Sequence, residues 1–241
     1  MKQLLKTGLE QLAKRFGKRI TNIHAPAKPF RQGVAFLKEI INPPSLIIDI
    51  GVADGTPDLT ASFPFSGYSY LLIEANPKFT DYLDKTQKSY PSNVFVERVF
   101  CGEQEATIPF FLNKTGHTAS RYYTVGQNGK IDVSVVPLDT IIKKYAKPGP
   151  YLLKVDVEGA ELDVLKGAIE TLKLCEVVIL ETWVNVPGSA GAADFATLVQ
   201  FMKENSFVVF DFFGGHNHQN GVLAHIDTVF VKEDSTYRLI A

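Results

Sequence analysis

Several features that mark particular protein classes are scarce or absent in this sequence of 241 residues. It contains only two cysteines, Cys101 and Cys175, which excludes a disulfide scaffold and indicates free thiols in a reduced compartment. No apolar run approaches the ~20 residues of a membrane span, and the first residues lack the apolar stretch of a signal peptide. The net charge of -1 argues against a nucleic-acid binder that works by bulk electrostatics. We therefore expect a cytoplasmic protein.

What is present is enough apolar sequence for a packed core, because 45% of the residues are hydrophobic. The charge is unevenly distributed: residues 1–31 carry a net +7 and the rest of the chain therefore carries -8. We expect an N-terminal helical extension over residues 1–31 and one domain over residues 32–241. Apolar residues of the extension recur at helical spacing on one face, with the cations around the other: Leu4, Leu5, Leu9, Leu12 and Phe16.

The sequence leaves open what this basic amphipathic helix does. It can pack on its own domain with a solvated basic face. Alternatively, residues 1–24 can lie on an anionic membrane surface, at the inner face of a membrane, or dock on a protein partner. The oligomeric state is equally open.

From residue 45 onward, short apolar runs alternate with segments of helical periodicity. Five runs are predicted strands: 45–50, 68–73, 94–100, 151–155 and 176–180. Four segments between them are predicted helices: 78–89, 138–145, 158–172 and 192–205. The last two runs, 207–213 and 222–232, follow one another without a helix and predict an antiparallel edge pair.

This order of elements predicts an α/β fold, namely a doubly wound, mostly parallel seven-stranded sheet with a C-terminal antiparallel hairpin. Ligands of such sheets bind beyond the carboxyl ends of the strands. The polar segment 112–130 is long for a connection, and we expect it to be a loop that faces the substrate.

Small residues follow the first predicted strand, which ends at Asp49-Ile50. Gly51, Ala53 and Gly55 let the backbone turn tightly and approach a ligand closely. The second strand ends nineteen residues after Gly55, at Glu74, and a carboxylate there can accept hydrogen bonds from two ribose hydroxyls. The combination predicts a cofactor that contains adenosine, bordered also by Ala75 and Asn76.

Two adenosine cofactors compete for this site. Dinucleotides favour the spacing G-x-G-x-x-G, which seats a pyrophosphate on a helix N-terminus. Here the spacing is G-x-A-x-G, and Asp54 lies inside the turn, where its charge would repel a pyrophosphate. S-adenosylmethionine has no phosphate, and its amino and sulfonium groups are compatible with Asp49 and Asp54. The residues therefore favour S-adenosylmethionine over NAD.

A charged cluster follows the fourth predicted strand. Lys154, Asp156 and Glu158 lie within five positions, and Gly159-Ala160 then opens a helix. Because charged side chains are rarely buried without partners, such a cluster at the carboxyl end of a strand indicates a site. The alternative is structural: Glu158 and Glu161 favour the helix N-terminus electrostatically, and Lys154 pairs with one of them.

This segment, residues 154–161, followed by Leu162, Leu165, Lys166 and Gly167, resembles the hallmark of FkbM-type methyltransferases. The resemblance extends over about residues 45–232 and includes four further stretches: 49–51, 74–77, 136–139 and 221–223 with Asp227. It implies a class I methyltransferase fold, S-adenosylmethionine as the methyl donor, and transfer to a hydroxyl of a sugar, polyketide or similar metabolite. One departure is Val52-Ala53, where the family commonly has Ala-Asn, so any contact made by the Asn side chain is in doubt.

The same resemblance implies roles for individual residues. Glu74 would bind the ribose, and Gly51 and Gly55 would line the methionine end. Cys101-Gly102, after the third strand, would border the adenine. For Cys101 the structural alternative is a buried thiol.

Methyl transfer to an alcohol requires help with removal of the hydroxyl proton. Candidate bases are Asp156, His225 in the last predicted strand, His117 in the polar segment, and Lys154 if its pKa were depressed. Within the charged cluster, Glu158 is a further candidate for a catalytic residue.

A second route is a divalent cation. Asp156 and Glu181, at the ends of neighbouring predicted strands, could hold Mg²⁺, which would lower the pKa of the acceptor hydroxyl. Trp183, Tyr122 and Tyr123 could stack on a sugar ring. Our reading is thus an S-adenosylmethionine-dependent O-methyltransferase that acts on a glycan or a small hydroxylated metabolite. The alternatives are an NAD-dependent oxidoreductase and a non-catalytic cofactor-binding or scaffold protein recruited by its basic N-terminal helix.

Overall fold

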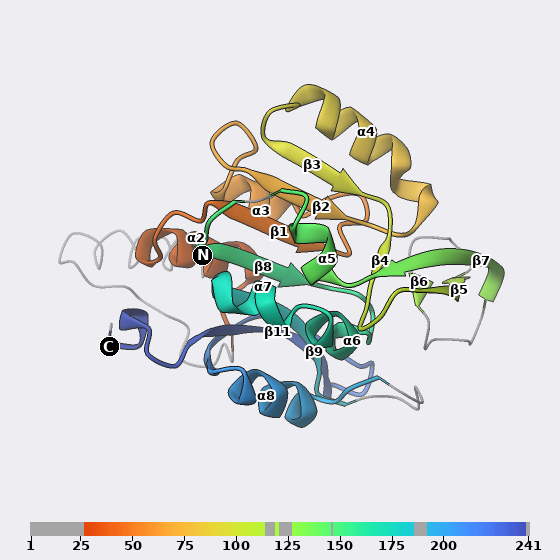
Figure 1. Ribbon diagram of the computed structural model, residues 1–241. Helices are drawn as coiled ribbons and strands as arrows, with labels where there is room; N and C mark the ends of the chain where they lie inside the picture. The colour runs from red at the N-terminus through yellow and green to blue at the C-terminus, as the bar shows by residue number, and fades with distance from the viewer. Residues whose placement is uncertain (1–26, 114–118, 121–126, 146, 186–191, 240–241) are drawn as a thin grey trace, which may run out of the picture.

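A computed structural model of the chain describes residues 27–113, 119–120, 127–145, 147–185 and 192–239 (Figure 1). A seven-stranded sheet forms its centre, in the order β10-β11-β9-β8-β1-β2-β3. The strands are β1 Leu46–Ile50, β2 Tyr70–Ile73, β3 Val94–Glu97, β8 Tyr151–Val155, β9 Cys175–Trp183, β10 Phe207–Asn217 and β11 Leu223–Lys232. Neighbouring strands from β3 to β9 are parallel, whereas β11 is antiparallel to both β9 and β10. The predicted fold class is confirmed.

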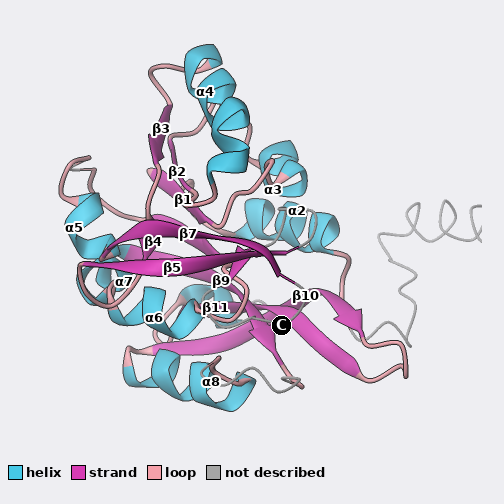
Figure 2. Ribbon diagram, turned by 90° about the vertical axis from the view of Figure 1, so that its right-hand side faces the viewer, coloured by secondary structure: helices cyan, strands magenta, loops and turns pink. Residues whose placement is uncertain are grey.

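Helices cover both faces of this sheet (Figure 2). On one face lie α2 Phe30–Ile40, α3 Pro57–Ser62 and α4 Thr80–Ser89, which contribute to one buried apolar cluster. On the other lie α5 Leu138–Ile142, α6 Glu161–Lys166, α7 Ile169–Leu174 and α8 Phe195–Glu204, which contribute to a second. Short 3-10 helices span Pro77–Phe79 (η1) and Thr236–Leu239 (η2). Because both faces are covered, β1 and β8 are buried along their whole length, which explains why they are apolar except for Asp49 and Lys154.

A second, four-stranded sheet was not expected from the sequence. Its order is β4-β7-β5-β6, with β4 Phe100–Cys101, β5 Ala106–Asn113, β6 Ala119–Ser120 and β7 Gln127–Val136. Figure 1 shows it beyond the arrowhead ends of the central strands. The prediction that residues 112–130 form a loop is therefore wrong at both ends, which belong to β5 and β7. Part of the segment between them lies outside the described residues.

The run 94–100 is two strands in two sheets rather than one strand. Glu97 makes the last pair with β2, at Ile73, where β2 itself ends. Beyond that point the chain has no neighbour in the central sheet, and Phe100 and Cys101 pair with β7 instead. Val94 and Phe100 are buried at the two ends of the run, whereas Glu97 and Arg98 lie at the break between the two strands.

The predicted helix 158–172 is also divided. It begins only at Glu161, and Gly167 separates α6 from α7. A Cβ atom at Gly167 would lie 2.0 Å from the carbonyl oxygen of Gly102, so the break lets two backbones approach closely. The other helices agree with their predictions to within a few residues. Among the described residues, no helix is long and apolar enough to cross a membrane.

The extension predicted for residues 1–31 is described only from residue 27. Lys28 forms a backbone bridge with Phe213 and an ion pair with Asp211, and α2 begins at Phe30. The predicted amphipathic helix lies outside the described residues.

Candidate active site

A cleft of about 280 Å³ opens at the carboxyl ends of β1, β2 and β8. Phe100 and Cys101 of β4 and Phe110 of β5 form part of its wall, so the small sheet completes it. Among the described residues, four carboxylates line the cleft, namely Asp54, Glu74, Asp156 and Glu158, and no lysine, arginine or histidine of this part of the chain does. A second hollow, of about 240 Å³, shares Gly51, Ala53 and Asp156 with the first and continues toward Asp227 of β11.

Gly51 allows the ends of three strands to meet. Its backbone has φ +81°, and a Cβ atom there would lie 1.8 Å from the carbonyl oxygen of Asp156. Its N–H donates to the Ile73 carbonyl at 2.9 Å, and the Asp156 N–H donates to the Ile50 carbonyl at 3.0 Å. The position therefore requires glycine for both conformation and space.

Glu74 fixes the turn after β1. Its Oε2 accepts the Ala53 N–H at 2.8 Å and its Oε1 accepts the Asn76 N–H at 2.7 Å. Burial raises the pKa of this carboxyl despite both hydrogen bonds. A carboxylate offers about four lone-pair sites, so capacity remains for hydroxyl donors in the cleft. Ala75 and Asn76 line the same wall.

Lys154 holds two carboxylates together beneath the cleft. Its Nζ lies 2.9 Å from Oδ2 of Asp156 and 3.9 Å from Oδ1 of Asp49, and its side chain is 5% exposed. Burial alone would lower the pKa of Lys154, but Asp156 and Asp49 outweigh it and the net direction is upward. Lys154 could act as a base only if its pKa were depressed, and this condition is not met. Asp49, also buried, accepts the Thr56 hydroxyl at 2.8 Å.

The turn after β8 carries Asp156 and Glu158 into the cleft. Glu158 has φ +56° and Gly159 φ +98°, so two consecutive residues are left-handed. Burial, followed by the charges of Glu181 and Asp156, raises the pKa of Glu158 to about 7. Glu161, fully buried, accepts the N–H groups of Val157 and Gly159 through Oε1, at 3.1 and 3.2 Å.

His225 is joined to Glu181 rather than to the cleft's own carboxylates. Its Nδ1–H donates to Oε1 of Glu181 at 2.8 Å, and this bond is the main reason why its pKa is raised. The imidazole stacks on His216, with ring centroids 5.4 Å apart, and lies 5.2 Å from the Trp183 ring. Asp227, opposite Glu181 in the strand register, has a pKa raised to about 7, mainly by burial.

The arrangement does not support the predicted magnesium site. β9 continues to Trp183, so Glu181 lies within the strand and not at its end, and its nearest partner is His225. Asp156 is engaged by Lys154. No group of three or more His, Cys, Asp or Glu side chains that could hold a metal ion occurs in the described part of the chain.

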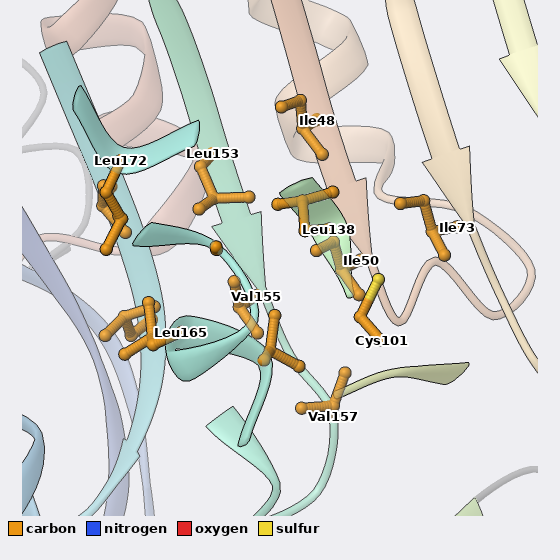
Figure 3. Close-up of a cluster of buried hydrophobic side chains, with 14 of the residues drawn as sticks. Ile48, Ile50, Ile73, Cys101, Leu138, Leu153, Val155, Val157, Leu165 and Leu172 are labelled. Carbon is orange, nitrogen blue, oxygen red and sulfur yellow. The ribbon is translucent and has the colours of Figure 1, made fainter. Parts of the chain in front are cut away.

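The remaining predicted residues lie in the cleft, in the second hollow, in neither of them, or outside the described residues. Asp54 and Cys101 line the cleft, and Cys101 belongs to the buried cluster that contains Ile50 and Val157 (Figure 3). Gly55 lines the second hollow, whereas Gly102 is not among the lining residues of either hollow and packs against Val135. His117, Tyr122 and Tyr123 lie outside the described residues.

Sequence reasoning missed Phe100, Phe110 and Glu161. The two phenylalanines carry no local signal for a ligand wall, because the small sheet that places them is formed by long-range pairing. Glu161 did carry a signal, because it lies in the charged segment. An acid at this position is equally expected at a helix N-terminus, so the signal was ambiguous.

Together the fold and the site define a class I methyltransferase. The sheet is parallel except for one antiparallel strand, β11, which lies between β9 and β10. A glycine turn follows β1, and an acid follows β2. The chain belongs to the FkbM methyltransferase family, because the Methyltransferase FkbM domain matches residues 49–209. This confirms the resemblance carried by residues 154–161.

Two characterised relatives are methyltransferases. The hexuronic acid methyltransferase AglP of Haloferax volcanii is 26% identical over 148 residues, which cover 61% of this chain and 60% of that protein. The methyltransferase sdnD of Sordaria araneosa is 29% identical over 180 residues, covering 60% of this chain and 70% of that protein. The chain thus spans about 60% of the length of the Haloferax enzyme.

Among solved structures, the 1,6-didemethyltoxoflavin-N1-methyltransferase of Burkholderia thailandensis, with bound 1,6-didemethyltoxoflavin and S-adenosylhomocysteine, is 10% identical. The match covers 85% of this chain and 78% of that chain, with a TM-score of 0.46. A match of this strength does not indicate a shared substrate.

Proposed function

We propose that this methyltransferase uses S-adenosylmethionine and methylates a hydroxyl oxygen of a sugar or of a small hydroxylated metabolite. The observation that carries the donor assignment is the charge of the cleft. Four carboxylates line it, and none of the lining residues that the structure describes is a lysine or arginine. Such a wall attracts the sulfonium and amino groups of S-adenosylmethionine and repels the pyrophosphate of NAD.

The residues of the cleft fit this cofactor. Glu74 retains acceptor capacity for ribose hydroxyls, and the left-handed turn at Gly51 and Ala53 brings backbone close to the ligand. Cys101 and Phe110 offer an apolar wall for the adenine ring. When bound, the cofactor supplies an electrophilic methyl group, and the chain's own residues must align and deprotonate the acceptor.

The base that fits an alcohol acceptor best is His225. Glu181 accepts its Nδ1–H, which fixes the tautomer so that Nε2 can receive the hydroxyl proton. The second hollow reaches from Asp156 to Asp227, two residues from His225 on β11, and gives the acceptor a place beside the donor cleft. Asp156 borders both hollows and is suited to orient the acceptor.

A sugar acceptor is supported by two facts of different kinds. The aromatic rings of Trp183, His225 and His216 lie side by side and offer a face on which a sugar ring can stack. The Haloferax relative is a hexuronic acid methyltransferase. Transfer to oxygen is supported by the candidate base His225, because an alcohol is a poor nucleophile unless a base removes its proton.

The test is calorimetric titration of the full chain with S-adenosylhomocysteine and, separately, with NAD⁺. We expect binding of S-adenosylhomocysteine only, weakened at least tenfold by E74A. The matched control is E97A, which removes an acid from the end of the neighbouring strand, where it binds Lys144 and Tyr145 outside the cleft. Binding of NAD⁺, or equal affinity in E74A, would contradict the assignment. A screen of hydroxylated sugars with labelled S-adenosylmethionine, with and without EDTA, then identifies the acceptor.

A further inference from the structure

The turn that joins β8 to α6 has an unfavourable backbone conformation. Glu158 has a left-handed backbone at φ +56°, a conformation that residues other than glycine and asparagine rarely adopt, and Gly159 follows at φ +98°. Asp156 and Glu158, which this turn carries, both line the cofactor cleft. Something outside the cleft must therefore hold the turn in place.

Glu161 makes the contacts that do this. Its side chain is fully buried and is not part of the cleft lining. One oxygen, Oε1, accepts the N–H of Val157 at 3.1 Å and the N–H of Gly159 at 3.2 Å. These two amides flank Glu158, so a single carboxyl group spans the strained residue.

The second oxygen of this carboxyl, Oε2, is buried and has no hydrogen-bond partner in the described part of the chain. Burial raises the pKa of Glu161 to about 8, and the charge of Glu181 contributes in the same direction. A neutral carboxyl is consistent with this place, because an ionised one would be buried without a cation.

We propose that Glu161 is a positioning residue for methyl transfer: its carboxyl oxygen clamps the turn that presents Asp156 and Glu158 to the reacting groups. The kinetic part of this inference rests on the proposed function. The clamp itself can be tested on the protein alone, so failure of one and failure of the other are distinguishable.

The chain offers a matched control. Asp139 makes the same kind of clamp away from the cleft, accepting the N–H groups of Glu170 and Thr171 at 2.9 and 2.7 Å. Loss of this clamp loosens the start of α7 without touching the turn after β8. D139L, which accepts no hydrogen bond, therefore measures what destabilisation alone does to turnover.

The first readout is the hydrogen-exchange rate of the Val157 and Gly159 amides, followed by NMR in the full chain. We expect at least tenfold faster exchange in E161L, which fills the site but accepts no hydrogen bond, and a change below threefold in E161Q, which keeps an acceptor oxygen. Unchanged protection of both amides in folded E161L would overturn the clamp.

The second readout is turnover with the acceptor found in the screen, measured well below the melting temperature of each variant. We expect kcat to fall about 100-fold in E161L, the loss typical of a small misplacement of catalytic groups, and to stay within threefold of wild type in E161Q and D139L. A kcat within twofold of wild type in E161L, or an equal loss in D139L, would overturn the positioning role.

If E161L does not fold, E161D takes its place in both measurements. Its carboxyl is one methylene shorter and cannot reach both amides, so faster exchange of at least one of them and a tenfold lower kcat are expected. Unchanged exchange or unchanged kcat in E161D would then overturn the proposal. A wild-type chain that binds no S-adenosylhomocysteine would refute the proposed function, and the exchange measurement would still decide on the clamp.

Discussion

His225 on β11 donates its Nδ1–H to Oε1 of Glu181 on β9 at 2.8 Å, across two neighbouring antiparallel strands. The strand register sets Asp227 opposite Glu181 and His225 opposite Trp183, so the bond is a diagonal one. The side chain of His225 is 26% exposed and that of Glu181 13% exposed, so the bond is largely shielded from water. This is the arrangement in which a carboxylate orients a histidine and raises its basicity.

The Glu181–His225 pair predicts the acidic limb of the pH–rate profile. A base works only when deprotonated, so kcat falls as the pH drops below the raised pKa of His225. E181Q removes the negative charge of Glu181 and weakens its hydrogen bond to His225, both of which raise that pKa, so we expect its limb to move to lower pH. H225N should lower kcat by about 10²- to 10⁴-fold, the range for loss of a general base.

The measurement is kcat against pH from about 5 to 9. H218N is the control, because His218 faces the Asn185 carbonyl and is not part of the stack. An acidic limb that does not move in E181Q would show that another group is the base.

Lys154 is expected to matter more to stability than any surface lysine. K154M would leave the carboxylates of Asp49 and Asp156 close together without their cation. Removing one partner of a buried ion pair costs about 3–5 kcal/mol, and urea denaturation can measure this. K166M breaks an exposed pair with Glu103 and should change the free energy of unfolding little. Equal effects of the two substitutions would contradict the structural role of Lys154.

Ala53 is a site where glycine should stabilise the chain. Its φ of +49° is left-handed, which costs a residue with a Cβ atom roughly 1–2 kcal/mol. The greater freedom of glycine in the unfolded chain offsets part of the gain, so we expect A53G to add about 0.5–1 kcal/mol. A35G, in the exposed middle of α2, should instead destabilise by about 1 kcal/mol. Thermal denaturation of both variants decides the matter, and destabilisation by A53G would refute the strain.

Stability should decline as the pH rises from about 5 to 8.5. Burial is the main cause that raises the pKa of Glu158 and Asp227 to about 7 and that of Glu161 to about 8. The folded chain therefore holds protons that the unfolded chain has released, and the stability these groups contribute is lost as the pH passes through their folded pKa values. Calorimetric melting at pH 5.5, 7 and 8.5 should give decreasing Tm, with a shallower decline in E161Q. A Tm that increases over this window would contradict the assignment.

Most residues on the proposed cofactor side of the cleft could be predicted from local sequence. The strand ending at Asp49-Ile50, the glycine at 51 and the acid at 74 each lie in one short segment, and neighbouring parallel strands necessarily bring their carboxyl ends together. The cluster at 154–158 also lies in one short segment, and it could be found because buried strands that end in charged residues are unusual.

Periodicity could not locate the breaks. The run 94–100 is apolar apart from Glu97 and Arg98, and only the end of β2 decides that Glu97 is its last residue in the central sheet. Likewise, the helical pattern of 158–172 does not show that Glu158 is left-handed or that Gly167 must leave room for the Gly102 carbonyl.

The sequence by itself determined the class of fold, the glycine turn, the acid at the end of the second strand and the charged segment after the fourth long strand of the sheet, because these depend on residues close together in the chain. Tertiary structure decided the rest. Long-range pairing of β7 with β4 and β5 builds the wall that holds Phe110, and the antiparallel register of β9 and β11 joins Glu181 to His225. Register and burial are properties of the assembled sheet, and no local pattern encodes which side chains will face one another across it.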